Sequence, residues 1–354
     1  MLHYQNLRQF IFRLDPEVAH SIVEFVCAFA PKIPALLPFV SKKFCFDDSI
    51  LFQEIDGMRF YNPVGLAAGF DKNATMLESL CALGFSHLEL GAVTPLAQSG
   101  NEKPRLWRHI NEESIQNAMG FNNDGANAVS MRLDKCYPFV LPLGVNIGKN
   151  KLTSQENAIK DYTALARIFE KNTDYLSVNI SSPNTPNLRD LQNETFVKEL
   201  FLALCEIYKK PIYLKLSPDL SIESALSLVE CAIDNGAKGI IATNTTLDYS
   251  LVVNPKEKGG ISGKVLAPKA REMLKQIALT LKVSKRKTTL ISVGGITNAQ
   301  EAYTRIRLGA NLVQVFSAMI FEGPSLVKNI NKGLKEYLER DGFNHISEAI
   351  GVDL

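Results

Sequence analysis

Residues 290–316 read LISVGGITNAQEAYTRIRLGANLVQVF. Two short apolar runs, Leu290–Val293 and Leu312–Phe316, flank a segment of helical period over Asn298–Leu308. Short apolar runs joined by a helical segment are typical of buried parallel strands with a crossover helix. The stretch therefore predicts one strand–helix–strand unit.

The same unit recurs along the chain from about residue 57. Six more apolar runs come before Leu290–Val293 in the chain. They are Val64–Ala68, His87–Val93, Leu141–Ile147, Tyr175–Ser181, Ile212–Leu216 and Gly239–Thr243. Helical patterns follow them, for example over Glu156–Lys171, Glu194–Tyr208 and Ile222–Asn235. Eight such units predict an α/β fold, a (β/α)₈ TIM barrel with its chemistry at the C-terminal ends of the strands. A doubly wound sheet would carry Gly-x-Gly-x-x-Gly after its first strand, but residues 67–72 read AAGFDK, which favours the barrel.

Composition narrows the class of protein. The chain has 354 residues, 46% hydrophobic and 21% charged, which excludes a disordered, collagen-like or coiled-coil protein. The net charge of +2 argues against a nucleic-acid-binding protein but allows a small anionic ligand. Six cysteines show neither a C-x-x-C pair nor zinc spacing with histidine, so we expect reduced thiols and no metal site.

The N-terminal segment carries apolar residues at helical spacing. They are Leu7, Phe10, Ile11 and Leu14, and then, after Asp15-Pro16-Glu17, Val18, Ile22, Phe25, Val26 and Phe29. Two short amphipathic helices are predicted, the second with an aspartate cap and a proline at its first position. Their apolar faces either pack on the main domain or enter a membrane surface. We assign residues 1–42 to this segment and residues 43–354 to the barrel.

Carboxamides dominate the residues at and after the strand ends. Five asparagines are expected on this face of the barrel: Asn117, Asn146, Asn179, Asn184 and Asn244. One amide offers an acceptor and two donors in a plane, which suits a flat heterocycle with carbonyl and N–H groups on its edge. A single asparagine more often serves a turn, but five on one face predict a planar ligand.

Glycines after the last strands indicate a phosphate. Gly294-Gly295 follows the seventh strand, Phe316-Ser317 follows the eighth, and Gly263 lies after the sixth. In barrels these two loops commonly bind phosphate on backbone N–H groups. A phosphate-bearing cofactor above an amide-lined floor is the inference.

The general base is not expected to be a histidine. The five histidines, at positions 3, 20, 87, 109 and 345, do not stand at a C-terminal strand end. The loop that starts at Asn179 instead presents hydroxyls, but a serine is a poor base unless its proton is relayed. From the residues alone, a catalytic loop and a structural turn both remain open.

Seven motifs, taken in order, closely resemble the dihydroorotate dehydrogenase family. They are AAGFDK (67–72), GNEKPR (100–105), NAMGFNN (117–123), NIGKN (146–150), NISSPNTP (179–186), ATNTT (242–246) and VGGI (293–296). The resemblance runs to about residue 335. It implies an FMN-dependent barrel enzyme that oxidises dihydroorotate to orotate in pyrimidine synthesis. The N-terminal helices, and serine rather than cysteine at the base position, resemble class 2, the quinone-reducing and membrane-associated form.

The resemblance also implies residue roles. Ser182 would remove a proton from ring carbon 5 while a hydride leaves carbon 6, and Lys72 would neutralise the substrate carboxylate. Substrate contacts would come from Lys72, Asn117, Ala118, Met119, Gly120, Phe121, Asn179, Asn184, Asn244 and Thr245. FMN contacts would come from Ala68, Gly69, Phe70, Asp71, Lys72, Ala92, Asn146, Asn179, Lys215, Thr243, Gly263, Gly295, Phe316 and Ser317.

Two positions depart from the pattern of this family. Ala92 replaces a hydroxyl residue beside the flavin, and Phe316 replaces a tyrosine near the quinone path.

The resemblance also implies three partners. The expected partners are dihydroorotate or orotate, a membrane quinone and a membrane surface that the N-terminal helices contact. The expected location is peripheral, on the cytoplasmic face of the inner membrane.

Three rival functions stay in view. A strand lysine such as Lys215 also suits a Schiff-base aldolase. A non-catalytic membrane-associated scaffold would use the N-terminal helices and ignore the barrel mouth. A soluble form coupled to fumarate or a nicotinamide is the third, and Ser182 with the N-terminal extension disfavours it.

Overall fold

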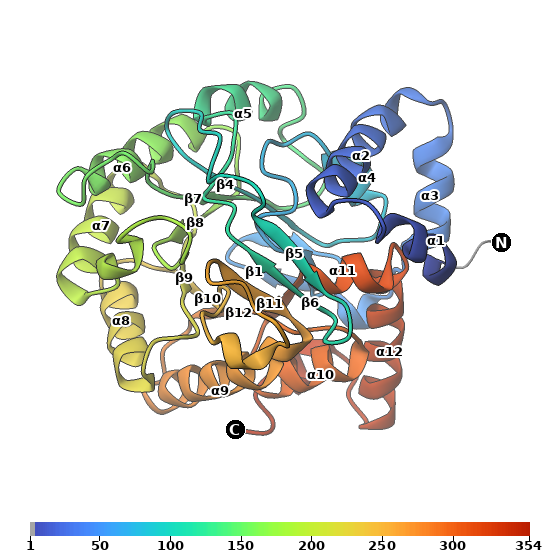
Figure 1. Cartoon of the computed structure of the whole chain (residues 1–354). Coiled ribbons are helices and arrows are strands. Elements are labelled where there is room, and N and C mark those ends of the chain that lie inside the picture. Colours follow the sequence, from blue (N-terminus) through green and yellow to red (C-terminus); the bar gives the residue numbers. More distant parts are fainter. Residues whose placement is uncertain (1–3) are drawn as a thin grey trace.

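Eight parallel strands close into a barrel in the computed structural model, which describes residues 4–354 (Figure 1). The predicted fold class is confirmed, and each predicted strand lies within two residues of the observed bounds. The barrel strands are β3 (Val64–Leu66), β4 (Leu88–Val93), β7 (Leu143–Ile147), β8 (Tyr175–Asn179), β9 (Ile212–Leu216), β10 (Gly239–Ala242), β12 (Thr289–Val293) and β13 (Leu312–Val315).

A ring of helices covers the barrel. It consists of α4 (Leu77–Cys81), α5 (Ala126–Leu133), α6 (Ala158–Phe169), α7 (Glu194–Ile207), α8 (Ile222–Asp234), α9 (Ala267–Val283), α10 (Ala299–Arg307) and α12 (Leu326–Arg340). Helix α7 shows why these segments are helical: Asn193 caps the first turn, and Val197, Leu200, Phe201 and Leu204 are buried at helical spacing. The remaining short elements are α11 (Ser317–Glu322), α13 (Ile346–Ala349), and the 3₁₀ turns η2 (Ser49–Leu51), η3 (Leu188–Leu191), η4 (Tyr249–Leu251) and η5 (Lys264–Leu266).

Two small antiparallel sheets were not predicted. Strands β5 (Leu106–His109), β6 (Ser114–Asn117) and β11 (Gly260–Gly263) form one of them, and β1 (Gln53–Ile55) and β2 (Met58–Phe60) form the other. Asp56, in the turn between β1 and β2, accepts hydrogen bonds from Tyr213 (2.8 Å) and Thr289 (2.7 Å). Those residues lie at the N-terminal ends of β9 and β12, so the β1–β2 hairpin covers the N-terminal end of the barrel and leaves the other end for the site.

The N-terminal segment forms α1 (Tyr4–Ile11), α2 (Pro16–Phe29), η1 (Ala30–Lys32) and α3 (Leu36–Phe44). The two predicted helices are confirmed, and Asp15 caps α2 by accepting from the N–H groups of Glu17 and Val18. Helix α3 was missed because it contains Pro38, which a first helical turn tolerates. The boundary drawn after residue 42 falls inside α3, and residues 1–3, which include His3, lie outside the described part of the chain.

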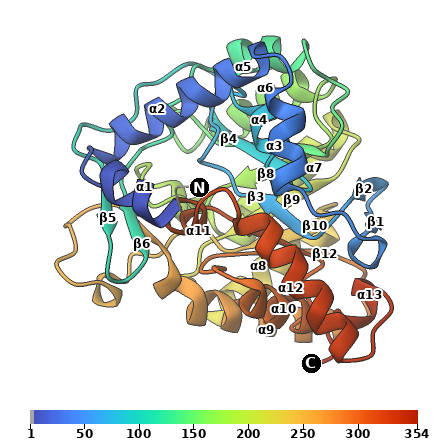
Figure 2. The same cartoon turned by 90° about the vertical axis from the view of Figure 1, so that its right-hand side faces the viewer.

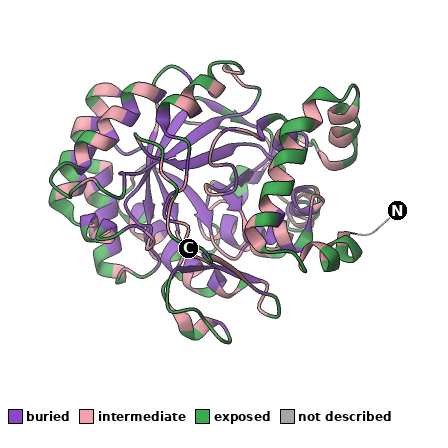
Figure 3. Ribbon diagram, turned by 45° about the horizontal axis from the view of Figure 1, so that its top comes forward, coloured by how far each residue is buried: buried purple, intermediate pink, exposed green. Residues whose placement is uncertain are grey.

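The N-terminal helices contact the barrel domain through α11, α4 and β5. Tyr4 and Arg8 donate side-chain hydrogen bonds to the carbonyls of Ile320 and Phe321 in α11, each at 2.7 Å. Along α1 and α2 only Ala19 is buried, whereas Phe25 is 71% exposed. Figure 2 shows the arrangement of α1, α2 and α3, and in Figure 3 these helices stand beside the barrel and are coloured mostly as exposed or intermediate. Among the described residues no single helix has the length and hydropathy of a membrane span, and only Pro16–Lys32 together with Leu36–Phe44, bent by 114°, satisfies that test.

Candidate active site

One cavity of about 570 Å³ lies at the C-terminal ends of the barrel strands. Its floor is made by strand side chains, among them Asn146, Asn179, Lys215 and Gln314. Its walls come from the loops after the strands and from β6 and β11, and one end reaches between α1, α2 and α11. Polar groups therefore gather at the strand ends, and apolar helices border the far end.

Glu89 is the charged centre of the floor. Its side chain, which lies on β4, is fully buried and accepts hydrogen bonds from Asn146 Nδ2 (2.8 Å), Lys215 Nζ (3.2 Å) and Gln314 Nε2 (2.7 Å). Burial alone would raise the pKa of Glu89, but the charge of Lys215 and these hydrogen bonds hold it below its usual value. The floor therefore contains a carboxylate and an ammonium in contact.

A directed chain of amides rises from this carboxylate. Asn146 Oδ1 accepts from Asn179 Nδ2 at 2.8 Å, and Asn179 Oδ1 accepts from Asn244 Nδ2 at 3.2 Å. Asn244 Oδ1 in turn accepts from the N–H of Thr245 at 2.8 Å. Because a carboxylate can only accept, Glu89 fixes which end of Asn146 faces it, and the other amides follow. Three of the five predicted asparagines are therefore joined in one network.

The other two asparagines join the Ser182 loop. Asn184 Nδ2 donates to Asn117 Oδ1 at 3.0 Å, which ties the loop after β8 to the end of β6. Ser182 is 5% exposed, lines the cavity and accepts from the N–H of Asn184 at 3.3 Å. A serine hydroxyl and two amides thus face the cavity from the wall opposite Lys72's strand end.

Lys72 brings a cation to the cavity. It follows β3 and lines the cavity together with Glu24 of α2. Its pKa is lowered to about 8, chiefly by burial, while the negative charge of Glu24 raises the pKa and the positive charge of Arg105 lowers it. An anionic ligand placed beside Lys72 would stabilise its charged form.

Several buried polar atoms of the cavity wall lack a partner. Within residues 4–354 these atoms are Asn122 Oδ1, Asn184 Oδ1, Thr245 Oγ1 and Gln314 Oε1. A buried polar group without a hydrogen bond is costly. They therefore fit a ligand that carries N–H or O–H donors, as a uracil-type ring or a flavin does.

The wall near the last strands is built from backbone and hydroxyls. Gly295 has φ +80°, and a Cβ there would lie 2.5 Å from the N atom of Ala267, so only glycine fits. Ser262 of β11 and Ser317 of α11 hydrogen-bond to each other at 2.9 Å beside it. Backbone and hydroxyl groups without acidic side chains suit a phosphate, as the sequence predicts.

The predicted site residues gather in this cavity with two exceptions. The lining includes Ala68, Gly69, Phe70, Lys72, Ala92, Asn117, Met119, Gly120, Phe121, Asn146, Asn179, Ser182, Asn184, Lys215, Thr243, Asn244, Thr245, Gly263, Gly295, Phe316 and Ser317. Asp71 does not line it, because its buried carboxylate accepts from the N–H groups of Asn73, Thr75 and Met76 and so shapes the loop after β3. Ala118 is also buried outside the lining.

Sequence reasoning missed three side chains of the site. Glu89 and Gln314 lie inside the apolar strands LELGAV and LVQV, and a polar residue within a fully buried strand was the signal that could have found them. The third is His20: the histidines were set aside because none stands at a strand end, but His20 lines the cavity from a helix. This residue reaches the cavity from α2, with Nε2 2.8 Å from the carbonyl of Phe70, and burial with the charge of Lys72 lowers its pKa.

Comparison with known proteins gives consistent matches. A family model described as dihydroorotate dehydrogenase matches residues 50–338. The dihydroorotate dehydrogenase (quinone) of Nitratiruptor sp. is 53% identical over 353 residues, with both chains covered completely, and that of Helicobacter acinonychis is 50% identical with 99% of each covered. A crystal structure of the Eimeria tenella enzyme in complex with ferulenol has 32% identity and a TM-score of 0.85, and covers 96% of each chain.

Proposed function

Because the chain belongs to the dihydroorotate dehydrogenase family, we propose that this cavity oxidises (S)-dihydroorotate to orotate, with a quinone as electron acceptor, in pyrimidine (UMP) synthesis. The family, the oxidoreductase class and the link to quinone predicted from the motifs are confirmed by the relatives. The observation that carries the site assignment is the convergence of Ser182 and five asparagines on one buried cavity.

We propose Ser182 as the base. Carbon 5 of the substrate loses a proton to Ser182 Oγ, which releases its own proton to solvent, and carbon 6 loses a hydride, so that a C5–C6 double bond forms. The position of Ser182 on the cavity wall supports this role, and so does its link to Asn184. The asparagine amides would hold the imide edge of the ring, and Lys72 would pair with its carboxylate.

We propose FMN as the resident cofactor. Bound FMN would take up the hydride and pass the two electrons on to the quinone. The glycine and hydroxyl wall at Gly263, Gly295 and Ser317 would hold the phosphate, and Asn146 with Lys215 would face the ring system. Lys215 would favour the anionic reduced ring by its charge. The same lysine is ion-paired with Glu89, whereas an aldolase needs an uncharged amine.

We propose that the quinone enters between the N-terminal helices and α11. The cavity end there is lined by Ile11, Val23, Ile320 and Pro324, which suits an apolar tail. The outer faces of α1, α2 and α3 expose Phe10, Phe25 and Phe39, which suits a lipid surface. The protein would then act as a peripheral protein on the cytoplasmic face of the inner membrane.

The purified protein tests these proposals directly. The bound cofactor is released and identified by absorbance and mass, and the protein is then given dihydroorotate with a quinone or with fumarate. We expect FMN, with turnover on the quinone but not on fumarate. Turnover on fumarate alone would support the soluble class instead, and a protein free of flavin would contradict the proposal.

A further inference from the structure

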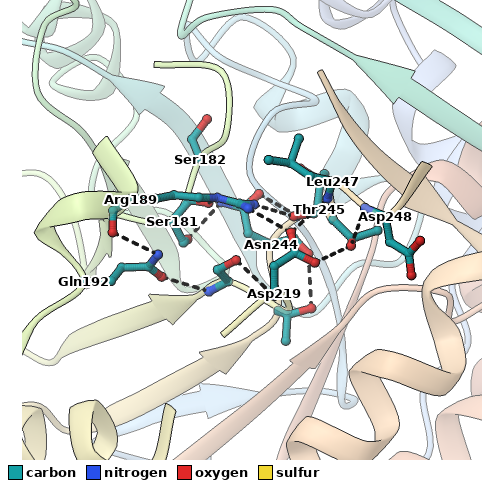
Figure 4. A network of polar contacts seen from close by, with 12 residues as sticks. Ser181, Ser182, Arg189, Gln192, Asp219, Asn244, Thr245, Leu247 and Asp248 are labelled. Atoms are coloured by element: carbon teal, nitrogen blue, oxygen red, sulfur yellow. Dashed lines mark hydrogen bonds and ion pairs between the residues drawn. The ribbon is translucent and has the colours of Figure 1, made fainter. Parts of the chain in front are cut away.

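A single arginine connects two loops of the cavity. Arg189 Nε donates to the carbonyl of Ser181 at 2.9 Å, and Arg189 Nη2 donates to the carbonyl of Thr245 at 2.8 Å. The third arm, Nη1, lies 2.8 Å from Asp219 Oδ2. Figure 4 shows this guanidinium in the middle of the network, with the Ser182 side chain pointing away from it.

Both carbonyls belong to loops that line the cavity. The carbonyl of Ser181 belongs to the peptide bond that leads into Ser182, on the loop after β8. The carbonyl of Thr245 belongs to the loop after β10, where Asn244 and Thr245 line the cavity. Because a guanidinium is planar and its N–H groups have fixed directions, Arg189 sets the distance between the Ser182 loop and the loop after β10.

Asp219 holds the arginine in place. It lies in the loop after β9 and also accepts from Lys269 Nζ (2.8 Å), the N–H of Leu247 (2.8 Å) and the hydroxyl of Thr246. Burial alone would raise the pKa of Asp219, but these hydrogen bonds and the one from Arg189 hold it below its usual value. Asp219 therefore stays charged at neutral pH and joins the loops after β9 and β10 to Arg189.

A second contact ties the same loop to its neighbour. Gln192 accepts from the N–H of Ser217 at 3.2 Å and donates to the carbonyl of Arg189 at 3.4 Å. The segment from Ser181 to Gln192 contains only the short turn η3 (Leu188–Leu191). Its position thus depends on side-chain contacts, of which Arg189 makes three.

We propose that Arg189, fixed by Asp219, is a positioning residue that places the Ser182 hydroxyl for proton removal from the substrate. This inference rests on the proposed function, in which Ser182 takes the proton from carbon 5. Arg189 itself does not line the cavity, so it would act through the loop. A displacement of about 1 Å of a reacting group can cost about 10²-fold in rate.

Three variants and one control test the proposal. Arg189→Met removes all three contacts. Arg189→Lys keeps the charge opposite Asp219 but cannot reach both carbonyls in one plane. Asp219→Asn weakens the ion pair that holds Arg189 in place. Arg286→Met is the control, because it removes an arginine paired with Asp234 at 2.8 Å before β12, at the opposite end of the barrel.

The measurements separate positioning from general damage. Anaerobic flavin reduction by dihydroorotate and reoxidation by quinone are timed separately, with substrate deuterated at carbon 5 or at carbon 6. For Arg189→Met we expect reduction to slow about 10²-fold, reoxidation to stay unchanged, and the isotope effect to grow at carbon 5 only. Arg189→Lys and Asp219→Asn should show smaller losses in the same step, and Arg286→Met none.

Other results would overturn the proposal. Unchanged reduction in Arg189→Met, or a full rate in Arg189→Lys and Asp219→Asn, would show that the serine keeps its place without the contacts. Equal growth of both isotope effects would show misplacement of the whole ring rather than of the base. If the unaltered protein itself did not reduce flavin with dihydroorotate, the proposed function would fail, and this inference with it. If Arg189→Met did not fold, the other two variants would decide.

Discussion

Glu89 and Lys215 form an ion pair inside the barrel, with 3.2 Å between Oε1 and Nζ, and both side chains are almost completely buried. The same carboxylate accepts from Asn146 and Gln314. One buried anion therefore neutralises the strand lysine and orients the amides above it. Two buried charges are costly to desolvate, so their presence on the floor of this cavity points to chemistry rather than to stability.

Glu89→Gln should destabilise the protein strongly. The substitution keeps the shape, but it leaves the Lys215 ammonium without a counter-charge and places an amide N–H donor against the donors of Asn146 or Gln314. We expect the free energy of unfolding in urea to fall by about 3 kcal/mol. Adding Lys215→Met should restore part of the loss, because no buried charge then stands alone. Purely additive effects of the two changes would contradict this coupling.

Ser182→Ala should impair one step only. The variant should keep its flavin and bind orotate, while flavin reduction by dihydroorotate slows by about 10²- to 10⁴-fold, as expected for loss of a general base. Single-turnover mixing measures this rate. Thr304→Ala is the control, because it removes a hydroxyl that donates within α10, to the carbonyl of Gln300, away from the cavity. A near-normal rate in Ser182→Ala would remove the serine from the mechanism.

Orotate binding should weaken as the pH rises through about 8. The Lys72 pKa is lowered to about 8 by burial, so below this pH the lysine is charged and can pair with the ligand carboxylate, and above it the charge is lost. The dissociation constant, followed by the flavin spectrum from pH 6.5 to 9.5, should rise by up to about tenfold per pH unit above 8. Lys72→Met should bind weakly at every pH, and Lys72→Arg should remove the pH dependence. A flat profile in the unaltered protein would contradict the pairing.

Vesicle binding should depend on three exposed phenylalanines. Phe10, Phe25 and Phe39 are 62%, 71% and 66% exposed, and each inserted ring contributes about 1.5–3 kcal/mol. Changing all three to serine should weaken binding to anionic vesicles by about 100-fold or more and slow turnover with a long-tailed quinone. Turnover with a small soluble acceptor should persist. The control replaces Leu152, Val253 and Val283 by serine, since these are exposed outside the N-terminal helices. An equal loss of vesicle binding in both triple variants would show that the N-terminal helices only pack on the barrel.

The sequence by itself determined the barrel and the polar residues at the ends of its strands. Buried parallel strands read as short apolar runs, and amphipathic helices read as a 3.6-residue period, because both signals are local to a segment. Polar residues at the strand ends could be assigned to one face, since all strands of such a barrel point the same way. The asparagines could therefore be grouped, and so could Ser182 and Lys72, before any contact was known.

Only the tertiary structure decided which of these groups touch. The bond from Arg189 to Thr245 spans 56 residues, and that from Lys215 to Glu89 spans 126. Such pairs leave no periodic signal in the chain. The loop role of Asp71, the position of His20 and the antiparallel sheet of β5, β6 and β11 are also invisible locally. Each depends on contacts between segments that meet only after the barrel closes. Composition and hydrophobic period therefore predict the fold, whereas tertiary packing decides the geometry of the site.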